Sequence, residues 1–153
     1  MKILLLASVL FSLGLSFSLL AAKTNIEQGC QSLVEQFFEA ARIGDNKVLE
    51  TFVLQGFPID QRNSQSYTAL MVAAYQGNKD SVRLLLEAGA NARLQDQSGN
   101  TALMGALRKR EISIVRDLYH AECSSELHNK AGLNLQEFAQ IYGRSKVLQS
   151  LQN

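Results

Sequence analysis

The sequence predicts an all-α solenoid of helix–turn–helix units, joined by short hairpin-like connectors. The segment Thr-Ala-Leu-Met occurs at 68–71 and again at 101–104, a step of 33 residues. Alanine recurs with the same step, at Ala40, Ala73, Ala106 and Ala139. A fixed period of this length is typical of a protein built from stacked copies of one supersecondary unit. Such a stack usually offers a binding surface rather than an enclosed reaction centre.

The first element, residues 1–22, is predicted to be a signal peptide. Lys2 supplies a positive charge, residues 3–20 form an uncharged run rich in Leu, Phe and Ser, and two alanines follow. The alternative is an uncleaved membrane anchor, since roughly 20 apolar residues can span a bilayer. Either interpretation predicts an exported protein, periplasmic or secreted, in which residues 23–30 form an N-terminal lead.

The repeat step then divides residues 31–153 into four units, at about 31–62, 63–95, 96–128 and 129–153. The second unit is the clearest. Thr68 is suited to begin its first helix, because a threonine hydroxyl can accept from a free backbone N–H. Gly77 is suited to end that helix, because glycine tolerates a positive φ. A second helix is expected over about 79–87, from apolar residues at helical spacing. The two end units have atypical sequences, as terminal repeats require.

Three segments resemble the ankyrin repeat. They are Gly-Asn-Thr-Ala-Leu-Met at 99–104, Ala-Ala-Tyr-Gln-Gly-Asn at 73–78 and Val-Arg-Leu-Leu-Leu-Glu-Ala-Gly-Ala-Asn at 82–91. The resemblance covers roughly residues 31–151 and is most specific in the second and third units. The usual Thr-Pro-Leu-His tetrapeptide of this family reads Thr-Ala-Leu-Met here. This chain therefore lacks the preset helical φ of the proline and the imidazole hydrogen bonds. Since Met is a flexible apolar filler, we expect a somewhat less rigid stack.

No catalytic or cofactor pattern is recognisable, so we expect no enzyme and no metal or cofactor site. The sequence has no Gly-rich phosphate loop, nucleophile elbow or His-Glu-x-x-His helix. The two histidines, His120 and His128, are expected at the surface. The alternative for His120 is a metal site with Glu122 and Cys123, for which one carboxylate, one His and one Cys are weak evidence. The alternative for His128 is a partner contact. Cys30 and Cys123 fall two units apart, too far for the roughly 7 Å that a disulfide allows between Cα atoms. We expect buried or partly buried free thiols, with an intermolecular bridge as the alternative.

The charge balance argues against two classes of partner, nucleic acid and the membrane surface. The chain has 15 basic and 14 acidic residues, a formal net charge of +1. A nucleic-acid binder needs a clear basic excess, so nucleic acid is not expected as a partner. Membrane contact is expected only if the N-terminal segment is retained, and the unbound protein is expected to be a monomer.

The resemblance implies a protein-binding site on a concave face made of connector tips and the exposed sides of the first helices. Carried over by repeat phase, this predicted face comprises Arg42, Ile43, Arg62, Ser64, Gln65, Tyr67, Tyr75, Gln76, Gln95, Gln97, Ser98, Asn100, Arg108, Lys109, His128, Lys130, Leu133, Ile141 and Tyr142. The set holds five basic residues, no acidic residue, and three of the four tyrosines. Because Arg and Tyr are enriched where interfaces gain most energy, we expect an acidic protein partner. The alternative for the basic run at 108–110 is a solvated helix end that its dipole stabilises.

The resemblance therefore implies a non-catalytic protein–protein interaction module in the periplasm. Similar exported bacterial proteins suggest three roles: an immunity protein or inhibitor that covers an enzyme's active site, an accessory factor for a partner enzyme such as a catalase, or a secreted protein directed at a host. The alternative from another class is a small-ligand or haem-binding carrier, with the His, Cys and Met residues as axial ligands. Against it, short stacked helices leave no obvious enclosed apolar pocket.

Overall fold

The computed structural model describes residues 27–122 and 127–152. Contacts divide the chain into two compact units, Met1–Glu35 and Gln36–Asn153. In the first unit the described residues are helical, so the lead expected over 23–30 includes at least four helical residues. The predicted signal peptide lies outside the described residues.

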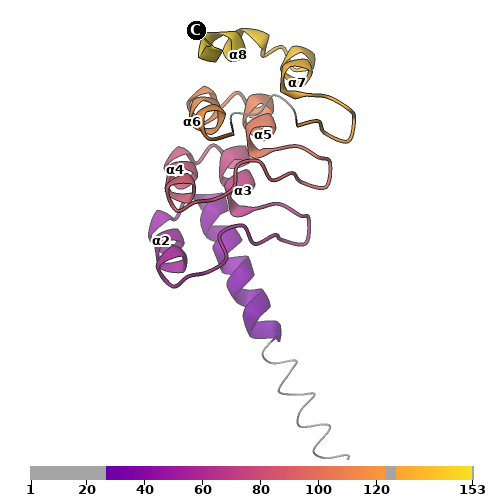
Figure 1. Cartoon of the computed structure of the whole chain (residues 1–153). Coiled ribbons are helices and arrows are strands. Elements are labelled where there is room, and N and C mark those ends of the chain that lie inside the picture. The colour runs from indigo at the N-terminus through magenta and orange to yellow at the C-terminus, as the bar shows by residue number, and fades with distance from the viewer. Residues whose placement is uncertain (1–26, 123–126, 153) are drawn as a thin grey trace, which may run out of the picture. The chain divides into compact units, whose positions relative to one another are not determined.

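The second unit is a stack of helix pairs, and none of its described residues lies in a β-strand. The first pair joins the helical residues 36–43 to α2 (Asn46–Leu54). The other pairs are α3 (Ala69–Gln76) with α4 (Lys79–Glu87), α5 (Ala102–Lys109) with α6 (Ile112–Glu122), and α7 (Leu135–Ile141) with α8 (Ser145–Gln152). In Figure 1, α2, α4, α6 and α8 form one column and α3, α5 and α7 form another. The predicted all-α solenoid is therefore confirmed.

Packing along each column buries the residues that the repeat phase aligns. Helix α5 packs between α3 and α7, and α4 packs between α2 and α6. The alanines of the repeat phase are almost wholly buried, and these small side chains let the helices approach closely. Phe37 fills the slot that Leu70 and Leu103 occupy in the next two repeats, and each of the three is 1% exposed. Burying a side chain of this size contributes about 1.5–3 kcal/mol.

The Thr-Ala-Leu-Met segments begin the first helices of the two middle repeats. The Oγ1 atom of Thr68 accepts from the N–H of Met71 at 3.3 Å, and Thr101 does the same with Met104. In the first of these helices the Met71 sulfur also accepts from the N–H of Thr68, at 3.5 Å. The sulfur thereby takes the place of the carboxylate that usually completes a capping box. The predicted role of threonine as the N-cap is confirmed.

The first helices end on a left-handed residue, which is glycine except in one repeat. Gly77 has a φ of +84° and Gly143 one of +65°. Arg110 occupies the equivalent position after α5 with a φ of +70°. This conformation is unfavourable for a residue with a Cβ, so the third repeat carries local strain at Arg110.

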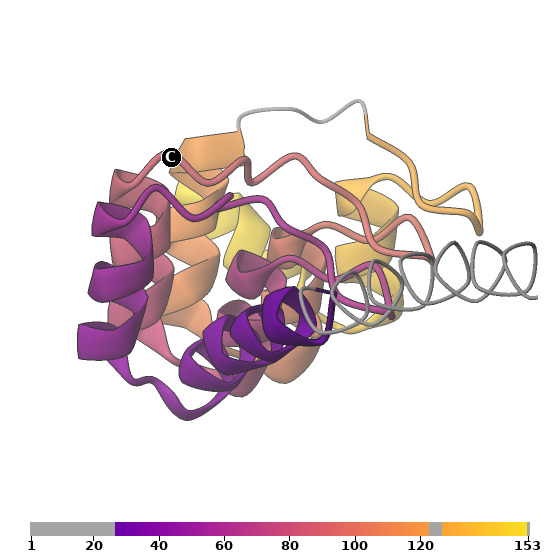
Figure 2. The same cartoon turned by 90° about the horizontal axis from the view of Figure 1, so that it is seen from below.

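Each connector is a hairpin organised by one Asn or Asp side chain. Asn63, Asp96 and Asn129 are separated by the repeat step, and each Oδ1 accepts from the amides two and four residues later, at 2.8–3.0 Å. Such side-chain bonds mimic a backbone turn. Figure 2 looks along the stack and shows the connectors of successive repeats running alongside one another. The predicted hairpin-like connectors are therefore present.

Candidate partner-binding site

The residues of the predicted face occupy two kinds of position. One set lies in the connectors, and the other lies in or just after the last turn of each first helix. None of these residues is buried. Four are half-buried, namely Tyr67, Gln95, Asn100 and Leu133, and the others are exposed. A partner could therefore reach the face, but its members differ in what they already contact.

Tyr75, Arg108 and Lys109 form a cluster on this face, which we call the Tyr75 cluster. The Arg108 guanidinium carbon lies 5.1 Å from the centroid of the Tyr75 ring, and the Lys109 ammonium nitrogen lies 4.2 Å from it. Positions 75 and 108 differ by one repeat, so adjacent first helices place these side chains next to each other. The ring remains 38% exposed. An aromatic ring that orders two cations at an accessible site is a suitable anchor for a negatively charged partner.

Arg62 and Gln95 connect neighbouring hairpins, a structural role that the sequence did not predict. One Arg62 nitrogen (Nη1) donates to the carbonyl oxygen of Ser66 at 2.7 Å and to that of Gln95 at 2.8 Å. The Gln95 amide nitrogen likewise donates to the carbonyl oxygens of Gly99, at 2.6 Å, and His128, at 2.9 Å. Each side chain thus closes its own turn and holds the next connector. Sequence phase alone placed both on the binding face, because it could not show where these side chains point.

Asn100 has a similar connecting role. Its Oδ1 accepts from the side-chain amide of Asn129 at 3.0 Å. Between the same two connectors, the backbone N–H of Lys130 donates to the carbonyl oxygen of Ser98 at 2.9 Å. The connectors that begin the third and fourth repeats are therefore cross-linked by hydrogen bonds.

The connector tips keep their side chains available. The side chains of Ser64, Gln65, Gln97, Ser98 and Lys130 make no hydrogen bond or ion pair within the described part of the chain. His128 is exposed at the base of the last connector. It differs from the tip residues because it already interacts with another group. Polar tips of this kind suit adaptable contacts at the rim of an interface.

The two ends of the face are more apolar than its centre. Ile43 is 63% exposed in the first repeat, and Ile141 is 64% exposed in the last. Tyr142 is 39% exposed, and its ring stacks on that of Phe138 at 4.5 Å between centroids. In the second repeat, Gln76 is the equivalent of Ile43 and Tyr142, and it is a polar, exposed residue. Basic groups therefore occupy the centre of the face, and apolar groups flank them.

The sequence-based expectation of a face without acidic groups needs correction at two places. Glu39 forms an ion pair with Arg42 on the same helix, which offsets the basic charge of the first repeat. Asp96 lies on the face between Tyr67 and Thr101, where its carboxylate accepts the two connector amides described above. Arg108 and Lys109 are thus two adjacent basic residues of the face that make no ion pair within the described residues.

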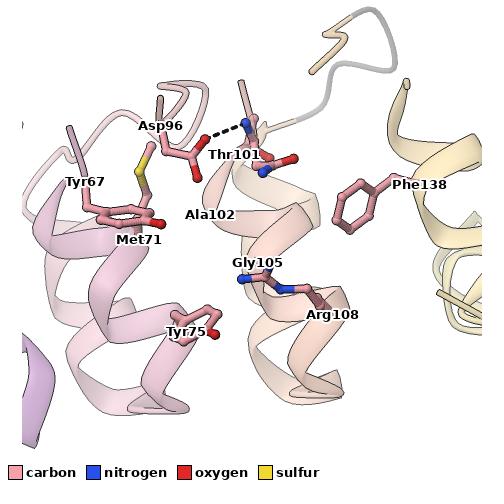
Figure 3. Close-up of a pocket in the computed structure, with 10 residues that line it drawn as sticks. Tyr67, Met71, Tyr75, Asp96, Thr101, Ala102, Gly105, Arg108 and Phe138 are labelled. Carbon is pink, nitrogen blue, oxygen red and sulfur yellow. Dashed lines mark hydrogen bonds between the residues drawn. The ribbon is translucent and has the colours of Figure 1, made fainter. Parts of the chain in front are cut away.

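A small pocket opens on the face beside the Tyr75 cluster (Figure 3). It lies over α5, between α3 and α7, and has a volume of about 30 Å³. Its lining consists of Tyr67, Met71, Tyr75, Asp96, Asn100, Thr101, Ala102, Gly105, Arg108 and Phe138. A space of this size holds one or two water molecules. Sequence reasoning missed Gly105 and Phe138, although both share the repeat phase of Val72 and could have been found that way.

The described residues give no sign of a metal site. Within them, no group of three or more His, Cys, Asp or Glu side chains could hold an ion. His120 is exposed near the end of α6, with its ring at 6.2 Å from that of Tyr119. Cys30 is free and exposed, so the expectation of a buried or partly buried thiol is wrong there. Cys123 lies outside the described residues.

Among the helices that the structure describes, none combines the length and the apolar character needed to cross a bilayer. The anchor considered for residues 1–22 lies outside those helices.

These features define a linear helical-repeat protein, in which each unit is a helix pair followed by a hairpin. The chain belongs to the ankyrin repeat family, because the family described as ankyrin repeats (3 copies) matches residues 37–130. The predicted family is therefore confirmed. Ankyrin repeats are a binding module and generally mediate protein–protein interactions.

Individual relatives support the same assignment. The chain is 34% identical over 104 residues to a putative ankyrin repeat-containing protein of Treponema pallidum, a match that covers 67% of this chain. It is 37% identical over 62 residues to the putative ankyrin repeat protein PA3287 of Pseudomonas aeruginosa, covering 40% of this chain. It is also 35% identical over 102 residues to Protein HOS4 of Saccharomyces cerevisiae, covering 61%. The matches span only 35%, 36% and 9% of these relatives, respectively.

Proposed function

We propose that this protein is an exported, non-catalytic module that binds an acidic surface of a partner protein through the predicted face. The observation that carries this proposal is the Tyr75 cluster, where two cations from α5 lie against an exposed tyrosine of α3. Neither the Arg108 nor the Lys109 side chain forms an ion pair within the described residues, so their charges are available to a carboxylate of the partner.

The rest of the face supports a protein as the partner. Exposed apolar side chains lie at both ends, at Ile43 and at Ile141 with Tyr142, and polar connector tips lie along one side. A charged centre with aromatic and aliphatic neighbours can bury apolar area and still select by charge. The formal net charge of +1 lacks the basic excess that nucleic acid would require.

The N-terminal sequence supports export. The charged start, apolar run and small residues of 1–22 have the order of a signal peptide. A periplasmic or secreted location follows from that pattern, and a membrane-attached form follows if the segment is retained. In such a compartment the module would act as an immunity protein or inhibitor, as an accessory factor for a partner enzyme, or as a protein secreted towards a host.

Neither of two pockets among the described residues supports the haem or small-ligand carrier. The pocket over α5 has only about 30 Å³, whereas ligand pockets usually have about 300–1,000 Å³. A larger hollow of about 390 Å³ lies beside α7 and α8. Its lining is mainly glutamine, with Leu148 as its apolar residue and no His, Cys or Met. A haem would find neither an axial ligand nor an apolar wall there.

The test is partner capture with two matched double variants of the full chain. In Arg108→Glu with Lys109→Glu, the charge of the Tyr75 cluster is reversed. In the control, Arg116→Glu with Lys146→Glu, exposed residues of α6 and α8 receive the same change in net charge. Each protein is immobilised, exposed to extract from the cells that produce it, and the captured proteins are quantified by mass spectrometry.

The proposal predicts a partner that the wild type and the control retain and the cluster variant loses. Reversing both cations should weaken binding at least about tenfold, because like charges would then face the acidic partner. If the cluster variant and the control retain the same proteins in equal amounts, the assignment of the binding face is wrong.

A further inference from the structure

Gly105 is the one glycine of the described first helices that lies in the middle of a helix, and packing does not explain it. A glycine inside a helix lowers stability relative to alanine. Beyond its chain neighbours and the backbone of its own helix, a Cβ built on Gly105 would meet no atom within 4 Å, so no packed group requires a residue without a side chain there. Its backbone also has no positive φ. Neither of the usual structural reasons for a glycine therefore applies.

The place of Gly105 on the surface suggests a reason connected with binding. The equivalent position is Val72 in the second repeat and Phe138 in the fourth. In the third repeat the missing side chain leaves a hollow, whose floor is Ala102 and Gly105. Figure 3 shows this floor between Tyr67, Met71 and Tyr75 on one side and Phe138 on the other. The walls are thus mainly aromatic or apolar. The floor consists of the two smallest residue types, alanine and glycine.

The charge at the edge of the hollow is on the same helix. Arg108 lies one turn after Gly105 and lines the pocket, and Lys109 follows it. In Figure 3 the Arg108 side chain extends back beside Gly105 towards Tyr75. The one acidic residue of the lining, Asp96, directs an oxygen to the backbone amides of Ser98 and Asn100. A ligand group would therefore meet an apolar hollow first and two cations immediately beside it.

We propose that the hollow over Gly105 is an anchor site for an extended acidic segment of the partner protein. A short side chain of that segment, such as Ala or Ser, would enter the hollow, and a neighbouring Asp or Glu would bind Arg108 and Lys109. The size of the hollow sets the first requirement, since about 30 Å³ admits a methyl-sized group and not an aromatic ring. Charge complementarity sets the second. This inference rests on the proposed function and specifies the partner chemistry of the same face.

The test begins with a library of random 12-residue peptides displayed on phage and selected against the wild-type full chain. The predicted consensus is a small residue next to Asp or Glu. The dissociation constant of a synthetic consensus peptide is then measured for the wild type and for Gly105→Val, Arg108→Glu and Arg116→Glu. Valine is the residue of the equivalent position in the second repeat, and it fills the hollow. A second filling variant, Gly105→Ala, has room for its methyl group and a better helix propensity, so it is expected to fold with an unchanged or higher Tm.

We expect Gly105→Val to bind the peptide at least about tenfold more weakly than the wild type, because overfilling a matched pocket is costly. Gly105→Ala should show a smaller loss, Arg108→Glu a loss like that of Gly105→Val, and Arg116→Glu none. If Arg108→Glu weakens binding but both Gly105 variants bind normally, the anchor site is wrong and the charged face stands. If no peptide is enriched, or the consensus lacks a small residue beside an acid, the anchor site is also wrong. If Arg108→Glu binds as the wild type does, the proposed function fails as well.

Discussion

The connection between the second and third connectors can be tested by removing one side chain, Gln95. Its amide nitrogen makes two hydrogen bonds, to the carbonyl oxygens of Gly99 and His128. One intramolecular hydrogen bond contributes a net stability of about 0.5–1.5 kcal/mol, so two give about 1–3 kcal/mol. Gln95 is half-buried and His128 is exposed, so water can replace the lost hydrogen bond at the His128 carbonyl oxygen after truncation. We therefore expect Gln95→Ala to lower the free energy of unfolding by about 1–2 kcal/mol.

The assay is urea unfolding of the full chain followed by far-UV circular dichroism, with Tm as a second measure. The predicted loss corresponds to a fall in Tm of about 3–8 °C for a domain of this size. Gln97→Ala is the matched control, because Gln97 is exposed two residues away and makes no hydrogen bond within the described part of the chain. It should stay within about 0.5 kcal/mol of the wild type. If both variants unfold at the same urea concentration as the wild type, Gln95 has no structural role, and only its predicted role as a partner contact is left.

Three further variants test the backbone and the cluster. Arg110→Gly should raise the free energy of unfolding by about 1 kcal/mol in the same urea assay, because glycine removes the left-handed strain at φ +70°; an unchanged value would show that the cap is not strained. Gly99→Ala should lower the free energy of unfolding by about 2–4 kcal/mol, since its Cβ would lie 2.7 Å from the backbone nitrogen of Lys130 and its φ is positive. A variant as stable as the wild type would contradict the close approach of the two connectors. Tyr75→Ala should weaken partner binding about tenfold and Tyr75→Phe much less, because the ring face orders the cations; equal losses in a binding titration would mean that the hydroxyl matters instead.

The sequence predicts the helix positions well, because the repeat phase aligns equivalent residues. Thr68 and Thr101 begin helices, Gly77 ends one, and Phe37 takes the core slot of Leu70, all as expected. These features are local or are repeated in each unit, so one clear copy defines the others. The side chains of Tyr75 and Arg108 also meet as the phase suggests.

The connector side chains could not be assigned from the sequence. Arg62 and Gln95 occupy the same phase with different chemistry, and both can donate to carbonyl oxygens of the next connector. That role depends on the distance between neighbouring hairpins, and the repeat period of the sequence does not predict this distance. The ion pair of Arg42 with Glu39 spans three residues on a helix and could have been found from spacing. The hollow over Gly105 needed both neighbouring repeats in place before it could be recognised.

The central claim is that a partner covers the Tyr75 cluster, and lysine labelling of the complex tests it most directly. Lys109 lies in the cluster, whereas Lys47 and Lys146 are exposed on α2 and α8. The full chain, alone and with its captured partner, is treated with an amine-acetylating reagent, and the rate at each lysine is read by mass spectrometry. We predict that the partner slows the labelling of Lys109 several-fold and leaves Lys47 and Lys146 unchanged. Protection of Lys47 or Lys146 with free labelling of Lys109 would contradict the account.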